Sequence, residues 1–338
     1  MKLALKLGLI HALIDAASGA IVYADLMQGR ISFELICYMV TVYNALAFGT
    51  QFIVGWIADY RRIYRSTMIS GIRIMILALI VQMYSHIPGV ILAGIGNSLF
   101  HVGAGAIVLQ QSDGKACDAG IFVAPGAIGL VIGLWLGVQT FAWQLILIPL
   151  LILSAVMTAK LQVRTDEPPE LKSSAMPDFP ILVCVFLLLM SVSVRGTVGG
   201  FISGAWRESH LTVFLLAIAA VAGKALGGMI ADRIGWRMLS VGALIISLPF
   251  AVFGSQHIMI ALTGMFFFQL TMPVTLEAVY LAFPNRAGFA FGLPCLALAL
   301  APGLTGFAAQ LNLSRFIIPV VFLSVGMIFF GLRFLKGK

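Results

Sequence analysis

Apolar runs of 18 or more residues recur from one end of this sequence to the other. Each run is long enough to cross the ~30 Å hydrocarbon core of a bilayer as a helix. Because that core offers the backbone no water, the crossing segments must be helices; a barrel would show alternating strands of about ten residues instead. Only 10% of the 338 residues are charged, whereas a soluble domain has about 25%. The sequence therefore predicts an all-α protein that crosses the membrane many times.

Twelve such spans can be counted. Their predicted ranges are 3–24, 32–58, 66–84, 88–111, 119–138, 142–160, 179–202, 210–231, 238–254, 257–282, 287–310 and 314–335. The first run has some features of a secretory signal peptide, but His11 and Asp15 interrupt the apolar stretch that such a peptide keeps free of polar residues. We therefore expect it to be the first membrane span.

One connection is much longer than the others. Residues 160–178 contain seven charged residues and three prolines, which is typical of a solvated linker. The chain is accordingly predicted to consist of a six-helix bundle over 1–160, a cytoplasmic linker over 161–178 and a second six-helix bundle over 179–338.

The distribution of Lys and Arg predicts the orientation. With the N-terminus in the cytoplasm, fifteen of the 21 basic residues fall on the cytoplasmic side, and the outer loops hold only Arg30, Arg207 and Arg315. This asymmetry follows the positive-inside rule, so the net charge of +8 calls for no nucleic-acid partner. We expect a monomer that crosses a bacterial inner (plasma) membrane many times and has both termini in the cytoplasm.

The chain repeats itself at about half its length. Gly55 and Asp59, in Gly-Trp-Ile-Ala-Asp at the end of the second span, correspond to Gly228 and Asp232, in Gly-Met-Ile-Ala-Asp at the end of the eighth. A second phrase, Ala-Pro-Gly, occurs at 124–126 in the fifth span and at 301–303 in the eleventh. Two parallel repeats of six helices are typical of carriers that rock two bundles about a site at the membrane midplane.

These phrases resemble the loop motif of major facilitator superfamily transporters, Gly-x-x-x-Asp-(Arg/Lys)-x-Gly-(Arg/Lys)-(Arg/Lys), which lies between their second and third helices. The second copy keeps Gly228, Asp232, Arg233, Gly235 and Arg237, with Trp236 at one basic position. The first copy keeps Gly55, Asp59 and a basic cluster that includes Arg61, but departs from the motif elsewhere between 60 and 64.

Within that superfamily the first half of the chain is similar to the fosmidomycin-resistance branch. The similarity lies in His11-x-x-x-Asp15 of the first span and in a glycine-rich stretch of the fourth span that ends at Phe100-His101. That branch usually has Pro after the second His, whereas this chain has Val102. The resemblance implies a cavity lined by spans one, four, seven and ten.

An Asp at the C-terminal end of a helix is opposed by that helix's own dipole. Asp59 and Asp232 therefore need a cationic partner or the N-terminus of another helix. Such a contact could hold the cytoplasmic side shut and break as the bundles rock, or it could be a static ion pair that anchors loops. The predicted gating motif comprises Gly55, Asp59, Arg61, Gly228, Asp232, Arg233 and Arg237.

Ionisable groups inside a membrane are costly and therefore mark functional sites. His11 and Asp15, four residues apart, share one helix face and can hydrogen-bond. The hypothesis is that Asp15 binds the coupled proton and His11 tunes it; the alternative is a packed pair that pins the first helix to a neighbour. His101, one helical turn from Asn97, is a candidate for coupling or for lining the cavity, or is a packing residue.

Two further embedded charges lie in the second half. Glu277 is predicted either to alternate between substrate and proton or to pair with an arginine at the inner gate, and Arg195 is the candidate for contact with an anionic or zwitterionic solute. The neutral side chains of Asn97 and Gln269 complete the predicted substrate-binding set. Arg195, Arg73 and Lys224 are the cations within spans, and they could equally neutralise the acids.

The remaining patterns exclude several functions. The four cysteines form no CxxC pair and the five histidines no HExxH spacing, so no metal and no cofactor is expected, and no ATP-binding Gly-x-x-x-x-Gly-Lys-Ser/Thr loop occurs. No catalytic constellation can be assembled, so we do not expect an enzyme. The sequence predicts a secondary transporter that moves a small solute by alternating access, with proton-coupled efflux as the first choice. Proton–solute symport and a non-transporting membrane scaffold are the alternatives.

Overall fold

The computed structural model describes residues 1–24, 32–161, 177–206, 209–310 and 316–334. Within these ranges the secondary structure is helical and contains no β-strand. The first half comprises α1 (Lys2–Tyr23), α2 (Phe33–Asn44), the π-helical turn η1 (Ala45–Gly49), α3 (Gln51–Arg61), α4 (Tyr64–Gln82), α5 (His86–Gln110), α6 (Ala116–Gly137) and α7 (Gln144–Ala159). The second half comprises α8 (Phe179–Gly204), α9 (His210–Ile234), α10 (Trp236–Phe253), α11 (Ile258–Gln269), α12 (Met272–Ala282), α13 (Ala287–Gln310) and α14 (Ile317–Gly331).

These helices confirm the predicted membrane fold. Nine helical segments in the described part of the chain are long and apolar enough to span a bilayer. Three shorter apolar helices, Gln144–Ala159, Trp236–Phe250 and Ile317–Gly331, fall on the remaining predicted spans. The molecule is therefore an all-α polytopic membrane protein.

Two spans are interrupted, which the sequence analysis did not predict. The second span consists of α2, η1 and α3, with the π-helical turn in its middle. The tenth breaks at residues 270–271, between α11 and α12. Pro273 stands in the first turn of α12, and because proline has no N–H it cannot continue the hydrogen bonds of α11.

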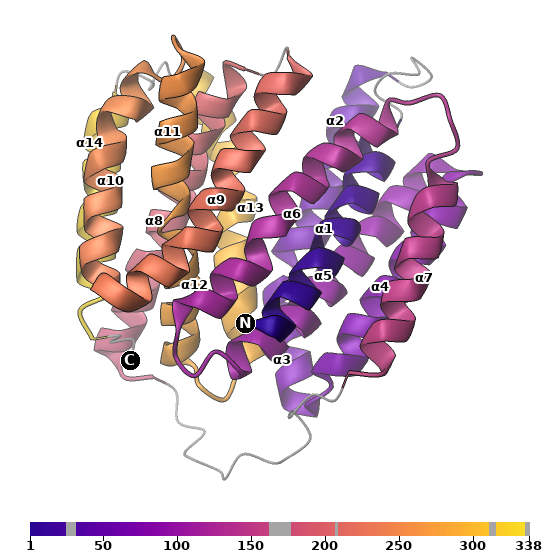
Figure 1. Ribbon diagram of the computed structural model, residues 1–338, viewed down its shortest axis with the longest axis horizontal. Helices are drawn as coiled ribbons and strands as arrows, with labels where there is room; N and C mark the ends of the chain where they lie inside the picture. Colours follow the sequence, from indigo (N-terminus) through magenta and orange to yellow (C-terminus); the bar gives the residue numbers. More distant parts are fainter. Residues whose placement is uncertain (25–31, 162–176, 207–208, 311–315, 335–338) are drawn as a thin grey trace.

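The helices form two groups that lie side by side (Figure 1), and each group packs around its own apolar core. The first core draws its residues from the first half of the chain, except for Leu276, Ala287, Phe291 and Cys295. The second draws on the second half, except for Ala116. The exceptions lie where the two bundles touch. The predicted linker falls almost entirely on 162–176, which lie outside the described residues.

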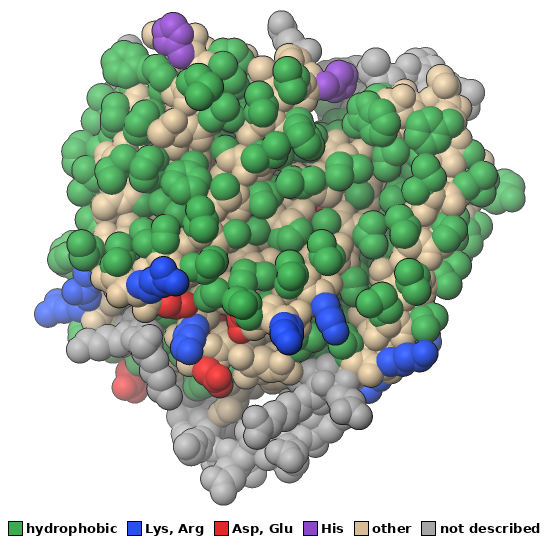
Figure 2. Space-filling view, in the orientation of Figure 1, with side chains coloured by type: hydrophobic (Ala, Val, Ile, Leu, Met, Phe, Trp, Pro, Cys, Tyr) green, Lys and Arg blue, Asp and Glu red, His purple; other side chains and the backbone are tan. Residues whose placement is uncertain are grey.

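Lys and Arg side chains gather along one end of the molecule (Figure 2). We call it the basic end; it contains the connections between α3 and α4, α5 and α6, α9 and α10, and α12 and α13. The outer arginines Arg30, Arg207 and Arg315 lie outside the described residues. Arg73, one of the three cations within the predicted spans, is exposed on the surface of α4.

The two bundles meet in the half of the molecule nearest the basic end. There α3 packs on α13 and α6 packs on α9. Gly55 lies directly against Gly288, and Gly228 against Ala116, and a Cβ on either Gly55 or Gly228 would overlap the facing backbone. Toward the opposite end the bundles separate (Figure 1), and a Cβ on Gly303 would meet no atom within 4 Å.

Candidate functional site

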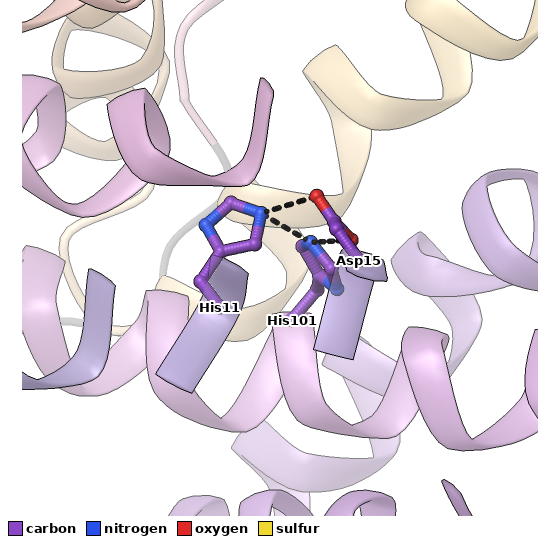
Figure 3. Close-up of side chains that lie close together, drawn as sticks. All are labelled: His11, Asp15 and His101. Atoms are coloured by element: carbon purple, nitrogen blue, oxygen red, sulfur yellow. Dashed lines mark hydrogen bonds and ion pairs between the residues drawn. The ribbon is translucent and has the colours of Figure 1, made fainter. Parts of the chain in front are cut away.

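Three of the predicted residues form one buried cluster in the first bundle (Figure 3). His11 and Asp15 project from α1, and His101 projects from α5. The Nε2 atoms of His11 and His101 are 2.7 Å apart. Asp15 Oδ2 lies 3.1 Å from His11 Nε2, and Asp15 Oδ1 lies 3.6 Å from His101 Nε2. Both imidazoles are buried, whereas the Asp15 side chain is 17% exposed and is the accessible member.

The other nitrogen of each imidazole faces a backbone carbonyl. His11 Nδ1 is 2.9 Å from the carbonyl oxygen of Phe122, and His101 Nδ1 is 2.9 Å from that of Asn97. A carbonyl oxygen can only accept, so both Nδ1 atoms must donate their N–H. In two neutral rings both Nε2 atoms would then carry lone pairs that face each other at hydrogen-bond distance.

The contact between the two rings therefore requires one additional proton. A proton between His11 Nε2 and His101 Nε2 turns the repulsion of two lone pairs into a charge-assisted hydrogen bond. The imidazole pair then has a charge of +1, and the carboxylate of Asp15 balances it. A proton on Asp15 could not remove this repulsion. Asp15 could donate it to only one of the two rings, and the Nε2 lone pair of the other ring would still lack a donor.

Asn97 and Ser18 hold the carboxylate in place. Asn97 Nδ2 donates to Asp15 Oδ1 at 3.1 Å and to Ser18 Oγ at 3.2 Å. The Asn97 side chain is fully buried, and its Oδ1 is unpaired among the described residues. Asn97, which the sequence predicted to bind substrate, is in this structure a hydrogen-bond donor to Asp15. Ser18 was not predicted from the sequence. It stands three residues after Asp15 on the same helix face, which is the signal that could have found it.

The composition of the cluster is also that of a metal site, because its three ligand atoms lie within 4.8 Å of one another. Two ligands at about 2.0–2.1 Å from a tetrahedral zinc ion would be about 3.3 Å apart. The 2.7 Å between the two Nε2 atoms is shorter than this and suits a shared proton. In this structure the two Nε2 atoms are therefore separated by the length of a hydrogen bond.

Glycines on α6 allow α1, which carries His11 and Asp15, to pack closely against α6. A Cβ on Gly129 or Gly133 would overlap the backbone of Ala12 or Ala16 on α1. Small residues that face each other let two membrane helices come together in this way. In the second repeat Gly303 corresponds to Gly126 and Gly306 to Gly129, and a Cβ on either would meet no atom within 4 Å. The two copies of the Ala-Pro-Gly phrase therefore share a sequence but not an environment.

Glu277 does not join this cluster. It lies in α12 near the basic end, fully buried, and accepts a hydrogen bond of 2.6 Å from Ser112 of the first bundle. Its second oxygen, Oε2, is buried and unpaired among the described residues. The arginine partner that the sequence suggested is replaced here by a serine hydroxyl from the loop between α5 and α6.

Arg195 lies in the second bundle, on α8, and is 7% exposed. Its guanidinium donates to the carbonyl oxygen of Ser191 at 3.1 Å and to the hydroxyls of Thr271 and Thr275. Gln269, predicted to bind substrate together with Arg195, lines the same cavity. The two threonines were not predicted from the sequence. They are four residues apart in an apolar run and therefore share one helix face, which is the signal that could have found them.

Lys224 of α9 lies at the interface between the bundles. Its backbone carbonyl packs against Gly120 of α6, and its ammonium group interacts electrostatically with Asp15. The two groups form no ion pair within 4.0 Å, so this is a longer-range attraction between a cation of the second bundle and the cluster of the first. The five titratable residues of the predicted site occupy three places: His11, Asp15 and His101 form the cluster, Glu277 contacts Ser112, and Arg195 lines the cavity.

Each Asp of the repeated loop motif binds the N-terminus of a helix in the other bundle. Asp59 accepts hydrogen bonds of 2.8 Å from the backbone N–H groups of both Gly288 and Phe289 at the start of α13. Asp232 accepts from those of Ala116 and Cys117, at 3.0 and 2.9 Å, at the start of α6. A helix N-terminus carries unpaired N–H groups and a positive dipole, so it is a favourable partner for a carboxylate.

The other members of the motif differ in role. Tyr64 donates to Asp59 at 2.7 Å, and Trp236, which replaces a basic residue of the family motif, donates to Asp232 at 3.0 Å. Arg237 instead donates to the carbonyl oxygen of Leu332 just past the end of α14. The remaining two arginines, Arg61 and Arg233, are exposed.

No protein-family model and no curated protein matches the chain. Among solved structures it is similar to a variant of the E. coli fucose:proton symporter FucP, with a TM-score of 0.73 and 11% identity over 100% of this chain and 99% of that one. It is also similar to the major facilitator superfamily transporter FucP in the outward conformation, with a TM-score of 0.66 and 12% identity over 98% of this chain and 100% of that one. The predicted fold, two parallel six-helix repeats of the major facilitator type, is thereby confirmed.

Proposed function

We propose that this chain is a secondary active transporter, which rocks the bundle 1–160 against the bundle 179–338 to export a small solute from the cell in exchange for protons. The observation that carries the proposal is the contact of 2.7 Å between His11 Nε2 and His101 Nε2. This contact holds one proton more than two neutral imidazoles, in a buried place where ionisable groups are costly and therefore functional. The same residues carry the resemblance to the fosmidomycin-resistance branch.

Occupancy by this proton changes the charge that the first bundle presents to the second. With the proton bound, the imidazole pair and Asp15 sum to zero. Without it, the two lone pairs repel and the charge of Asp15 is unbalanced, so its attraction to Lys224 of the second bundle increases. Binding and loss of a proton in the first bundle thus alter the energy of the interface along which the bundles move.

The contacts of Asp59 and Asp232 serve as the gate in this proposal. Both carboxylates bridge the bundles near the basic end, which is closed, while the opposite ends of the helices are apart. Opening the basic end requires both to leave their helix N-termini. We assign the basic end to the cytoplasm on the positive-inside rule.

The test is transport by the purified protein in proteoliposomes that contain a pH-sensitive dye, with a panel of solutes and an imposed pH gradient. Solute-dependent proton movement is expected in the wild type and in Glu34→Gln, which removes an exposed carboxylate of the same bundle. Asp15→Asn is expected to abolish it. Proton-driven transport that survives Asp15→Asn would refute coupling at the cluster.

The direction of movement separates the alternatives. Solute that moves against the proton flow supports exchange and hence efflux, whereas solute that moves with the protons establishes symport. A wild-type protein that moves neither protons nor any solute of the panel would support the non-transporting scaffold.

A further inference from the structure

A cavity of about 250 Å³ lies within the second bundle, beside the C-terminal half of α8. Its wall is mostly apolar and contains Val192, Ile202, Met265, Phe268, Met272 and Leu298. The polar groups that reach it are few, with Arg195, Ser203 and Gln269 among them. An apolar cavity with a few convergent polar groups is the usual form of a small-molecule site, and its volume is just below the about 300–1,000 Å³ of sites for drug-sized ligands.

Arg195 enters this cavity as a buried cation without an anion. Its described partners, the carbonyl of Ser191 and the hydroxyls of Thr271 and Thr275, are all neutral. No Asp or Glu among the described residues forms an ion pair with it. A buried charge is costly unless it is paired. The three neutral acceptors fix the orientation of the guanidinium and leave its charge to be balanced by a ligand.

The chemistry of the cavity defines the class of that ligand. A guanidinium binds a carboxylate through two parallel hydrogen bonds, and one guanidinium balances one negative charge. The apolar wall suits a hydrocarbon or aromatic body, and the cavity volume restricts its size. We infer that the solute is a small monocarboxylate with an apolar body, its carboxylate on Arg195 and its body among the apolar side chains.

This assignment rests on the proposed transport function and gives its substrate class. It also places solute and proton in different bundles, because Arg195 belongs to the second and the proton cluster to the first. Solute and proton therefore need not compete for one group.

Gly199 allows the cavity to be tested without a change in Arg195. It lines the cavity, and a Cβ built on it meets nothing within 4 Å, so a larger side chain there would project into free space. Gly199→Leu should fill the cavity. Gly242, on α10, is likewise free of neighbours within 4 Å but does not line the cavity, so Gly242→Leu controls for the loss of a helix glycine.

The experiment measures saturable binding to the purified full-length protein by calorimetry and by thermal stabilisation. The probes are benzoate, its neutral analogue benzamide and the dianion phthalate. Benzoate is expected to bind about 10- to 100-fold more tightly than benzamide, because benzamide loses the charged hydrogen bonds to the guanidinium. Arg195→Gln and Gly199→Leu should abolish binding of benzoate, and Gly242→Leu should retain it.

Equal binding of benzoate and benzamide, undiminished binding to Arg195→Gln, or no saturable binding of benzoate to the wild type would overturn the inference. Tighter binding of phthalate would overturn the assignment of a single charge. The proposed function fails separately: proton-driven flux of other solutes without carboxylate binding refutes only the substrate class. Carboxylate binding without proton-driven flux of any solute refutes only the transport mechanism.

Discussion

Gly126 of α6 lies against the ring of His11, and a Cβ built on this glycine would overlap His11 Nε2. The same Cβ would lie 2.6 Å from Asp15 Oδ2. The glycine therefore does more than let two helices approach, because its missing side chain leaves room for His11, one of the two rings that share the proton, and for Asp15, which balances the charge.

Gly126→Ala is accordingly predicted to disturb the cluster. The added methyl group must displace His11 or Asp15 or move α6 away from α1, at a cost of about 1–3 kcal/mol in stability, which is typical of an overpacked core. Both the proton-coupled flux and the melting temperature of the variant should be lower than those of the wild type. The matched control is Gly303→Ala, at the corresponding place of the second repeat, where a Cβ meets nothing within 4 Å. Equal effects of the two substitutions would contradict this account.

The shared proton predicts an unusual pattern of histidine protonation. Both rings should be protonated at Nδ1, because each Nδ1 faces a carbonyl oxygen, and one proton should be shared between the Nε2 atoms. Nitrogen-15 NMR of labelled histidine in the reconstituted protein reports this directly, with His11→Asn and His101→Asn to assign the signals. A neutral ring with its proton on Nε2 at either position would rule out the arrangement.

Loss of one gate carboxylate is predicted to favour opening of the basic end. Asp59→Ala removes a helix cap, an interaction of about 0.5–2 kcal/mol, so the ratio of open to closed molecules should rise by about 2- to 30-fold. Cys117, at the other gate contact, can report opening through its rate of thiol labelling once Cys37, Cys184 and Cys295 are replaced.

The control for this measurement is Arg61→Ala, because Arg61 is exposed and stands two residues from Asp59. It should leave the labelling rate near that of the parent protein, while Asp59→Asn, which keeps one acceptor oxygen, should lie between the parent and Asp59→Ala. If Arg61→Ala opened the basic end as much as Asp59→Ala, the charge of the loop rather than the cap would be the cause.

The Glu277 contact gives a prediction through a double-mutant cycle. Ser112→Ala removes the described hydrogen bond of a buried carboxylate, and an unpaired buried group costs about 1–3 kcal/mol. Glu277→Gln replaces the carboxyl group with an amide of similar shape that tolerates the loss better. Thermal unfolding should therefore show Ser112→Ala to be less harmful in the Glu277→Gln background. Strictly additive effects would show that the two side chains do not act as a pair.

The membrane fold could be predicted because it depends on local properties of the chain. The length of each apolar run and the positions of Lys and Arg are independent of how the helices pack, and the structure places helices on all twelve predicted spans. The contact of His11 with Asp15 is also local, since four residues form about one turn.

The rest depends on which helices become neighbours. The distance between His11 and His101 follows from the packing of α1 on α5, and the contact of Glu277 with Ser112 from the meeting of two bundles. Neither leaves a periodic signal in the sequence. The two Ala-Pro-Gly phrases show the limit most clearly, since one is packed tightly and the other is open. The first phrase packs against α1 of its own bundle, whereas no atom lies within 4 Å of a Cβ placed on the glycine of the second.

In both gate contacts the groups that donate to the carboxylate from the other bundle are backbone amides, at Gly288 and Phe289 in one and at Ala116 and Cys117 in the other. One partner in each gate contact is thus the backbone and not a side chain. The side chains that tune each gate contact are therefore the aspartate, which reaches the other bundle, and the Tyr64 or Trp236 that supports it within its own bundle. A lost aspartate cannot be replaced by reversing a charge on the other bundle, because its partner there is the backbone. Because the half-chain is repeated, the molecule has two such gate contacts, one with Asp59 and one with Asp232.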